Sequence, residues 1–177
     1  MKKIELTTER LILREIRKSD WKDMHEYAVD PDVYKFMPWG PNTVEDTKNY
    51  IQSVIDSRQE VPRTKFELAI ILKATQKRIG GCGITVFDAE NKQGWIGYCL
   101  NKSFWGKGYV TEASIKLLEF GFNNLDLHRI FATCDTKNIA SARVMEKIGM
   151  EREGLMRDDK LIRKKWRDSF LYAVIKK

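Results

Sequence analysis

The chain has 177 residues, enough for one domain with a well-formed core and too few for two ordinary ones, so we expect a single domain over residues 1–177. Hydrophobic residues make up 42% and charged residues 32%, as in soluble globular proteins, and no apolar run approaches the roughly 20 residues of a membrane span. The formal net charge of +7 bears on solubility and encounter before it bears on function. This composition excludes a protein that crosses a membrane by helices, and we expect no membrane partner.

The first residues and the cysteines bear on the cellular compartment. The start of the chain is charged and lacks an apolar signal segment, so we expect a cytoplasmic protein. Cys82, Cys99 and Cys134 each lie in an apolar, strand-like segment without a close-spaced Cys or His partner. We therefore expect buried thiols rather than a disulfide, and no bound metal.

The densest positive charge lies between Lys160 and Arg167. The run is short and stands beside alternating strand residues, and no standard nucleic-acid-binding motif accompanies it. The pattern favours a solvated hairpin, and we expect no nucleic-acid partner.

The N-terminal part of the chain alternates between strand and helix signals. Apolar spacing, Ser and Asp caps, and a Thr43/Asp46 capping box mark the boundaries. They predict a strand over 11–16, a helix from 21 to about 30, an aromatic-rich loop over 34–42, and a helix from 43 to about 58.

The remainder of the chain predicts a meander followed by a crossover. Short apolar runs and intervening turns predict strands over 66–72, 81–87 and 95–100, a helix that follows the glycine loop and ends near Asn123-Asn124, and a strand over 129–134. A strand-helix-strand unit of this length implies a parallel pair. A short helix capped by Asn138 or Ser141 then ends at Gly149, before strands over 151–158 and 166–175. The expected class is α+β, a mostly antiparallel sheet with one parallel pair and flanking helices.

The most informative segment joins the strand over 95–100 to the next helix through a glycine loop. Unpaired N–H groups at a helix start, supported by the helix dipole, favour a phosphate-bearing ligand. A dinucleotide fingerprint fails because Thr111 stands where its third glycine belongs, and a P-loop fails because Tyr109 stands where it needs Lys. A short pyrophosphate cradle in a mostly antiparallel sheet remains.

At this point the chain resembles the GNAT superfamily of N-acetyltransferases, and within it the branch of the ribosomal-protein alanine N-acetyltransferases. Five segments carry the resemblance in family order: Thr8 to Arg14, Trp105 to Tyr109, Leu127 to Ile130, Asn138 to Met150, and Arg167 to Tyr172. The family's loop pattern is Gln or Arg, two residues, Gly, one residue, then Gly or Ala. Gly108 matches it, whereas Trp105 and Val110 depart from the flanking positions.

The resemblance implies that the sheet splays between the strands over 95–100 and 129–134, and that the pantetheine arm of acetyl-CoA adds to the freed edge as another strand. Gly97 marks either a bulge that opens this wedge or a packing glycine. No metal is implied. The implied acetyl-CoA-binding residues are Tyr98, Cys99, Leu100, Trp105, Gly106, Lys107, Gly108, Tyr109, Val110, Thr111, Asn138, Ser141 and Arg143.

The resemblance also implies direct attack of an amine on the thioester. A backbone N–H of Cys99 or Leu100 is expected to stabilise the oxyanion. Many family members protonate the departing thiolate with a Tyr four residues before the Gly149 position. This chain has Met145 there, so Ser141, one helical turn earlier, is the expected donor. A covalent route through Cys99 is not favoured, because no His lies near it in sequence.

The general base is not evident from the sequence. Related sequences often carry an acid just ahead of the Ile-Gly-Tyr stretch, where this chain has Trp95. Glu67, His25, Asp88 and Glu112 remain, although each is more often a structural or solvated residue. Freeing a lysine amine costs about 3 to 4 kcal/mol more than freeing a peptide α-amine, so a weak base favours an N-terminal acceptor.

The acceptor is expected to enter between the aromatic loop, with Tyr34, Phe36 and Trp39, and the final strand pair. We expect an acetyl-CoA-dependent N-acetyltransferase that acts on a protein N-terminus. A small amine, polyamine or aminoglycoside acceptor stays an alternative, as does a catalytically silent CoA-binding or interaction module. A homodimer is left open.

Overall fold

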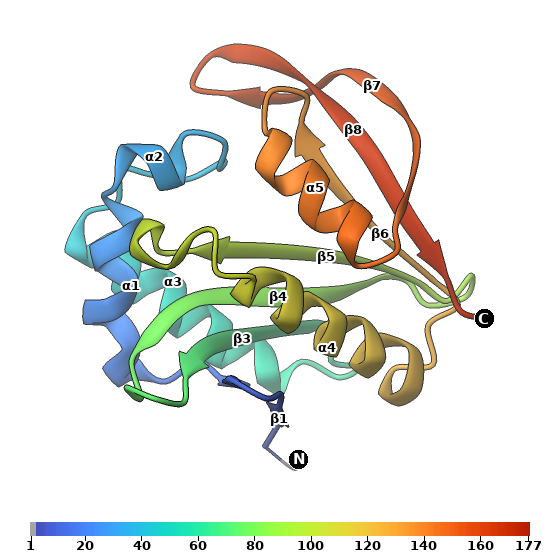
Figure 1. Ribbon diagram of the computed structural model, residues 1–177. Helices are drawn as coiled ribbons and strands as arrows, with labels where there is room; N and C mark the ends of the chain where they lie inside the picture. Colours follow the sequence, from blue (N-terminus) through green and yellow to red (C-terminus); the bar gives the residue numbers. More distant parts are fainter. Residues whose placement is uncertain (1–2) are drawn as a thin grey trace.

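The computed structural model describes residues 3–177 as one mixed β-sheet with helices on both faces (Figure 1). The strand order is β1-β2-β3-β4-β5-β6-β8-β7. The strands are β1 (Glu5–Thr7), β2 (Leu11–Glu15), β3 (Lys65–Leu72), β4 (Arg78–Asp88), β5 (Gln93–Leu100), β6 (Arg129–Asp135), β7 (Glu151–Ile162) and β8 (Lys165–Ile175). The helices are η1 (Lys18–Asp20), α1 (Trp21–Ala28), α2 (Pro31–Tyr34), α3 (Val44–Asp56), η2 (Ser57–Gln59), η3 (Lys102–Phe104), α4 (Tyr109–Asn124) and α5 (Ile139–Lys147).

This architecture confirms the predicted fold class. Every neighbouring strand pair is antiparallel except β5 and β6, which the crossover helix α4 connects. Asn138, and not Ser141, caps α5, because its side chain accepts a hydrogen bond from the backbone N–H of Ser141. The pattern did not predict β1 or the short α2, and β7 continues four residues beyond the predicted end at Asp158.

Each face of the sheet has its own apolar core. Leu68 and Ile70 of β3 pack under α4, whereas Ala69 and Ile71 of the same strand pack under α1 and α3. Figure 1 shows α4 crossing one face of the sheet, with α1 and α3 on the other. Because side chains alternate along a strand, Glu67 lies on the α1/α3 face.

The parallel pair β5/β6 is short. Only three register pairs join the two strands, and the last joins Trp95 to Phe131. Beyond it the strands diverge, as Figure 1 shows, while β6 stays paired with β8 along its whole length. The edge of β5 from Ile96 to Leu100 that faces β6 therefore lacks a strand partner, which we call the wedge.

Gly97 is a packing glycine rather than a bulge. The β4/β5 register runs without interruption from Gly80/Leu100 to Val86/Gly94, so the wedge does not arise from a bulge in this ladder. The Trp95 ring lies over Gly97, and a Cβ there would be 2.8 Å from it.

No helix within residues 3–177 is long and apolar enough to cross a membrane. All three cysteines are free; Cys82 and Cys134 are buried, and Cys99 is half-buried.

Candidate active site

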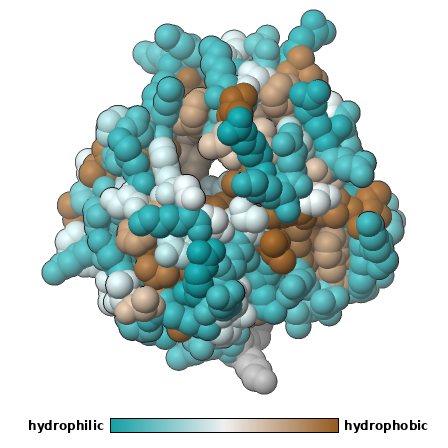
Figure 2. Space-filling model, viewed as in Figure 1, coloured by the Kyte–Doolittle hydropathy of each residue, from teal (hydrophilic) through white to brown (hydrophobic). Residues whose placement is uncertain are grey.

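A cavity of about 1040 Å³ begins in the wedge and continues onto the α1/α3 face of the sheet. Figure 2 shows the molecule hollowed at this position. The structure brings together most residues expected to bind acetyl-CoA or the acceptor. Those that line the cavity are Tyr98, Cys99, Leu100, Trp105, Gly106, Gly108, Val110, Thr111, Asn138, Ser141, Glu67, Phe36 and Trp39.

The glycine loop adopts the conformation that a pyrophosphate cradle requires. Gly106 and Gly108 have φ angles of 74° and 78°, in the left-handed region that favours glycine, and Gly108 is the N-cap of α4. The N–H groups of the following turn have no acceptor within the helix and point out of its positive end. The loop thus presents backbone donors toward the cavity.

The turn between β1 and β2 holds this loop in place. Glu112 of α4 accepts hydrogen bonds from Thr8 Oγ1 at 2.6 Å and from the Arg10 backbone and guanidinium at 2.9 and 2.7 Å. The Arg10 guanidinium also donates to the carbonyl of Lys107 at 3.0 Å. The conformation of the loop is therefore supported by contacts from a segment 100 residues away in sequence.

Two loop side chains expected to bind the cofactor do not line the cavity. Lys107 donates to the carbonyl of Ser103 at 3.2 Å. The Tyr109 ring lies under the Arg10 guanidinium, 4.6 Å from its carbon. Arg143 is exposed on α5 outside the cavity lining, so its contact with a nucleotide phosphate stays a prediction.

The departures from the family loop pattern have physical explanations. The indole N–H of Trp105 donates to the carbonyl of Leu100 at 2.8 Å, which ties the loop to the end of β5. The Val110 side chain is partly buried against the α4-face core, and the residue also borders the cavity.

The strand register decides which backbone N–H groups face the wedge. The N–H of Asn101 donates to the Ile79 carbonyl of the preceding strand segment. Because N–H directions alternate along a strand, the N–H of Cys99 also points toward β4, and the N–H groups of Leu100 and Tyr98 point into the wedge. The prediction that Cys99 donates an N–H to the oxyanion is therefore wrong, and Leu100 is the donor of the expected pair that faces the wedge.

Ser141 lies at the opposite wall of the wedge. Its Oγ is 3.0 Å from the Tyr98 hydroxyl, and that hydroxyl also donates to the Ser141 carbonyl at 3.1 Å. Burial raises the pKa of Tyr98, so its phenol stays protonated at neutral pH. The linked hydroxyls of Tyr98 and Ser141 thus lie beside the wedge. Many family members have a Tyr at the position of Met145, and in this chain the Met145 side chain is buried in the core.

Glu67 is the one expected base candidate whose side chain lines the cavity. Its carboxylate lies over Gly83, where a Cβ would be 2.5 Å from Oε2. Burial raises the pKa of Glu67, and a hydrogen bond from Tyr50 and the charge of Arg78 offset the effect only in part. A carboxylate with a raised pKa is suited to accept a proton near neutral pH.

The other base candidates have structural roles. His25 Nδ1 is 3.0 Å from Thr47 Oγ1 and joins α1 to α3. Asp88 accepts from Asn91 in the β4/β5 turn. Burial acts to raise the pKa of Glu112, but hydrogen bonds from Thr8 and Arg10 outweigh it and lower the pKa. None of the three borders the cavity.

Three thiols border the cavity, those of Cys82, Cys99 and Cys134, and burial raises the pKa of each, so all are poorly suited to act as nucleophiles. Burial raises the pKa of Cys99 to about 12 and that of Cys134 to about 11. The thiolate, which is the reactive form, is therefore scarce at neutral pH, in agreement with direct transfer to the acceptor.

The β7/β8 hairpin closes the acceptor end of the cavity. Arg163 Nη2 donates to the carbonyls of Tyr34, Trp39 and Gly40, and Arg167 Nη1 donates to the carbonyl of Phe36 at 2.7 Å. Residues 163–166 are exposed, as expected for a solvated hairpin, whereas Arg167 is half-buried. The Tyr34 ring lies under Arg163, 5.1 Å from its guanidinium carbon, and outside the cavity lining, contrary to its expected role.

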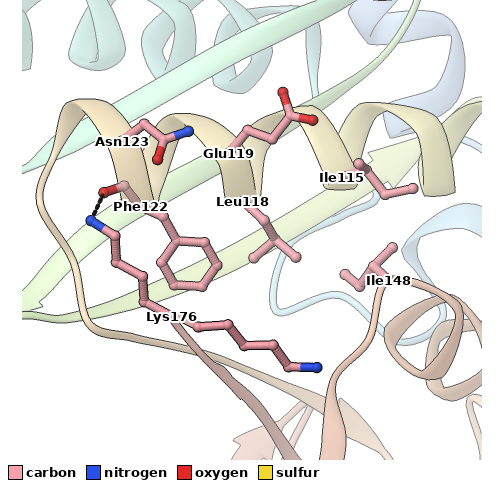
Figure 3. Close-up of a pocket in the computed structure, with 8 residues that line it drawn as sticks. Ile115, Leu118, Glu119, Phe122, Asn123, Ile148 and Lys176 are labelled. Atoms are coloured by element: carbon pink, nitrogen blue, oxygen red, sulfur yellow. Dashed lines mark hydrogen bonds between the residues drawn. The ribbon is translucent and has the colours of Figure 1, made fainter.

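A second hollow of about 290 Å³ lies between α4 and the C-terminal residues (Figure 3). Ile115, Leu118 and Phe122 form its wall, and Lys176 Nζ donates to the carbonyl of Phe122 at 2.8 Å. It is shallow, open and mainly apolar, and it places no catalytic group.

Comparison with known proteins agrees with this geometry. The profile of the acetyltransferase (GNAT) domain matches residues 10–151. The chain belongs to the GNAT acetyltransferase family.

Two relatives match along nearly the whole chain. The chain is 37% identical to the uncharacterized N-acetyltransferase YnaD of Bacillus subtilis over 97% of each protein. It is 27% identical to the [ribosomal protein uS5]-alanine N-acetyltransferase of Escherichia coli, over 97% of this chain and 91% of that protein. The chain is therefore similar to N-acetyltransferases throughout its length.

Two solved structures share the fold. A GNAT-family acetyltransferase from Bacillus anthracis superposes with a TM-score of 0.86 at 34% identity, covering 97% of this chain and 98% of that one. The ribosomal L7/L12 α-N-protein acetyltransferase RimL, in complex with coenzyme A, superposes with a TM-score of 0.86 at 21% identity, covering 97% and 98%. This GNAT protein is an N-acetyltransferase by family and fold.

Replacing Gly108 with Val tests the cradle. A β-branched residue at φ 78° is strained, and relieving the strain rotates the loop N–H groups. We expect the Kd for acetyl-CoA, measured by calorimetry, to rise on the order of 10- to 100-fold. Gly154→Val is the control, since a Cβ there meets no atom within 4 Å. Unchanged affinity in Gly108→Val would contradict the placement of the pyrophosphate.

Proposed function

We propose that this protein transfers an acetyl group from acetyl-CoA directly to the α-amine of a protein N-terminus, with Glu67 as general base. The observation that carries the proposal is the single cavity that joins the wedge to the Glu67 carboxylate. One end offers an unpaired strand edge and a ring of backbone donors; the other offers a proton acceptor.

The donor end fits acetyl-CoA. An extended pantetheine arm with two amide groups can pair with the free edge of β5, as a peptide adds to a sheet. The loop N–H groups at the start of α4 suit its pyrophosphate. The structure of RimL with coenzyme A shows that this fold can hold the molecule.

The acceptor end fits a chain terminus. The cavity runs past Glu67 to a rim that includes Phe36 and Trp39, which leaves room for the first residues of an extended peptide. The relative that acetylates the alanine of ribosomal protein uS5 supports a protein acceptor. An α-amine also needs less help to lose its proton than a lysine does.

The chemistry follows from the placement of the groups. The neutral amine attacks the thioester carbonyl carbon, and Glu67, directly or through water, accepts the proton that the nitrogen loses as the C–N bond forms. The Leu100 N–H stabilises the oxyanion while the carbon is tetrahedral. The C–S bond then breaks, and the thiolate of coenzyme A takes a proton through Ser141, which Tyr98 orients. The products are the acetylated amine and free coenzyme A.

A panel of acceptors tests the proposed function. The protein is incubated with acetyl-CoA and with peptides, proteins, lysine-containing substrates, polyamines and aminoglycosides, and thiol release is followed while mass spectrometry identifies the acetylated atom. We expect turnover with free peptide N-termini and none with the same peptides blocked at the α-amine. If only small amines are acetylated, the acceptor is a small amine and not a protein N-terminus. If acetyl-CoA binds and no acceptor is acetylated, the protein is a catalytically silent CoA-binding module.

Glu67→Gln removes the proposed base with little change of shape. We expect kcat/KM for the acceptor to fall by roughly 10²- to 10⁴-fold, with acetyl-CoA affinity unchanged. In the wild type, activity rises as pH rises through the raised pKa of Glu67, because the base acts deprotonated; the variant loses this limb of the profile. Asp88→Asn, outside the cavity, is the matched control. A normal rate in Glu67→Gln would exclude Glu67 as the base.

Ser141→Ala removes the expected donor to the thiolate. We expect kcat to fall roughly 10- to 100-fold, with little change in the KM for acetyl-CoA, because the hydroxyl acts mainly when the C–S bond breaks. Steady-state kinetics measures the split, and Tyr98→Phe is expected to cost less. An unchanged kcat would remove Ser141 from the mechanism.

A further inference from the structure

Arg78 is a buried cation without a close ion-pair partner. The residue is 2% exposed, yet it forms no ion pair with any residue of the described range 3–177, unlike Arg14, which bonds Asp20 at 2.7 Å. Its Nε donates to the carbonyl of Gly80 at 3.1 Å, and its buried Nη1 has no hydrogen-bond partner. The carboxylates of Asp20 and Glu67 act on the guanidinium only from beyond ion-pair distance. A buried guanidinium compensated only in part costs stability, and an anion supplied by a ligand would lower that cost.

A β-bulge directs Arg78 into the cavity. The register passes from Ile70/Gly80 to Ile71/Arg78, so Ile79 is an extra residue on β4. Ile79 enters the α4-face core, and Arg78 turns to the opposite face, where its guanidinium carbon is 6.0 Å from the Tyr27 ring centroid and borders the cavity. Bulges commonly re-aim a side chain beside an active site.

Glu67 and Arg78 lie over neighbouring positions of a glycine floor. A Cβ on Gly83 would be 2.5 Å from the Glu67 carboxylate, and a Cβ on Gly81 would be 3.5 Å from Arg78 Nη2. Residues two apart on a strand share a face and are about 7 Å apart. The proton acceptor and the cation thus lie over two glycine positions whose spacing is about the length of one dipeptide.

The other carboxylates that border the cavity already bond within the protein. Asp32 pairs with Lys102, Asp46 caps α3 through Thr43, and Asp135 accepts the N–H of Lys137. None of them forms an ion pair with Arg78, which leaves its charge available to a ligand.

We propose that Arg78 binds a carboxylate of the acceptor, about one residue from the amine that Glu67 deprotonates, so that the enzyme selects amines accompanied by an acidic group. This inference rests on the proposed function and names its substrate class. Two sources carry such a group: an acidic side chain at the second residue of a protein N-terminus, and the terminal carboxylate of a dipeptide. In both, the guanidinium forms charge-assisted hydrogen bonds with the carboxylate.

Peptides that differ in one group test the proposal. Hexapeptides with Glu or Gln at the second residue are compared with a dipeptide bearing a free or an amidated C-terminus. We expect wild-type kcat/KM to favour the carboxylate member of at least one pair by roughly 10- to 100-fold. The pair that shows the larger preference identifies the source.

Variants then assign the preference to Arg78. In Arg78→Met, we expect the preference for the carboxylate peptide to fall to about 3-fold or less. Arg157→Met removes an exposed arginine outside the cavity, and we expect this variant to keep the wild-type preference. If Arg78→Met does not fold, Arg78→Lys replaces it. The comparison of wild-type rates within each peptide pair still tests whether the enzyme prefers a carboxylate. Equal rates within both wild-type pairs, or a preference that survives in Arg78→Met, would overturn the proposal.

A binding measurement separates this inference from the proposed function. In the presence of coenzyme A, the carboxylate peptide is expected to raise the wild-type melting temperature more than its amide partner does. If no peptide is acetylated but this difference is present and lost in Arg78→Met, the proposed reaction fails and the carboxylate site stands. If peptides are acetylated and both members give equal shifts and equal rates, the carboxylate site fails and the reaction stands.

Discussion

The early end of the β5/β6 pairing is the constraint on which the site depends. Three register pairs hold the two strands together, and beyond Trp95 and Phe131 they separate. In a parallel sheet the crossover helix normally covers a continuous surface, but here its start lies beside an open strand edge. The same divergence exposes the N–H of Leu100, gives the glycine loop a cavity to face, and places Ser141 across from Tyr98. The end of the site that is proposed to hold acetyl-CoA thus follows from the early end of the β5/β6 pairing.

Long-range polar contacts keep the irregular segments around the wedge in place. Glu112 accepts hydrogen bonds from Thr8 and Arg10 at one end, and Arg163 donates to three carbonyls of residues 34–40 at the other. Each contact satisfies backbone or carboxylate groups that a loop would otherwise present to water. The glycine loop and the acceptor rim are therefore ordered by β1/β2 and by the β7/β8 hairpin, the two ends of the chain.

The local signals in the sequence were sufficient for most of the fold. Apolar periodicity, the Thr43/Asp46 box and the length of the crossover predicted the meander, the helices and the parallel pair, because these depend on neighbouring residues. A family motif marked Gly108 and Ser141, and both border the cavity. The structural role of Glu112 depends on distant segments, because only the fold shows that Thr8 and Arg10 donate to its carboxylate, whereas Glu67 borders the cavity. The sequence did not indicate Arg78 as a site residue, because only the adjacent Gly80 and Gly81 indicated a bulge in this strand.

The acceptor face of the cavity holds two buried groups of opposite charge, which protein interiors normally pair directly. Glu67 and Arg78 have opposite signs and lie over one glycine floor, yet no direct ion pair joins them. A direct ion pair would hold Glu67 ionised with a low pKa and would saturate the guanidinium, and neither group would then serve a ligand. Because Glu67 and Arg78 do not form a direct ion pair, the carboxylate keeps a raised pKa and the guanidinium keeps an N–H group without an acceptor. The spacing set by Gly81 and Gly83 thus keeps both groups available, at the expense of burying each without a full partner.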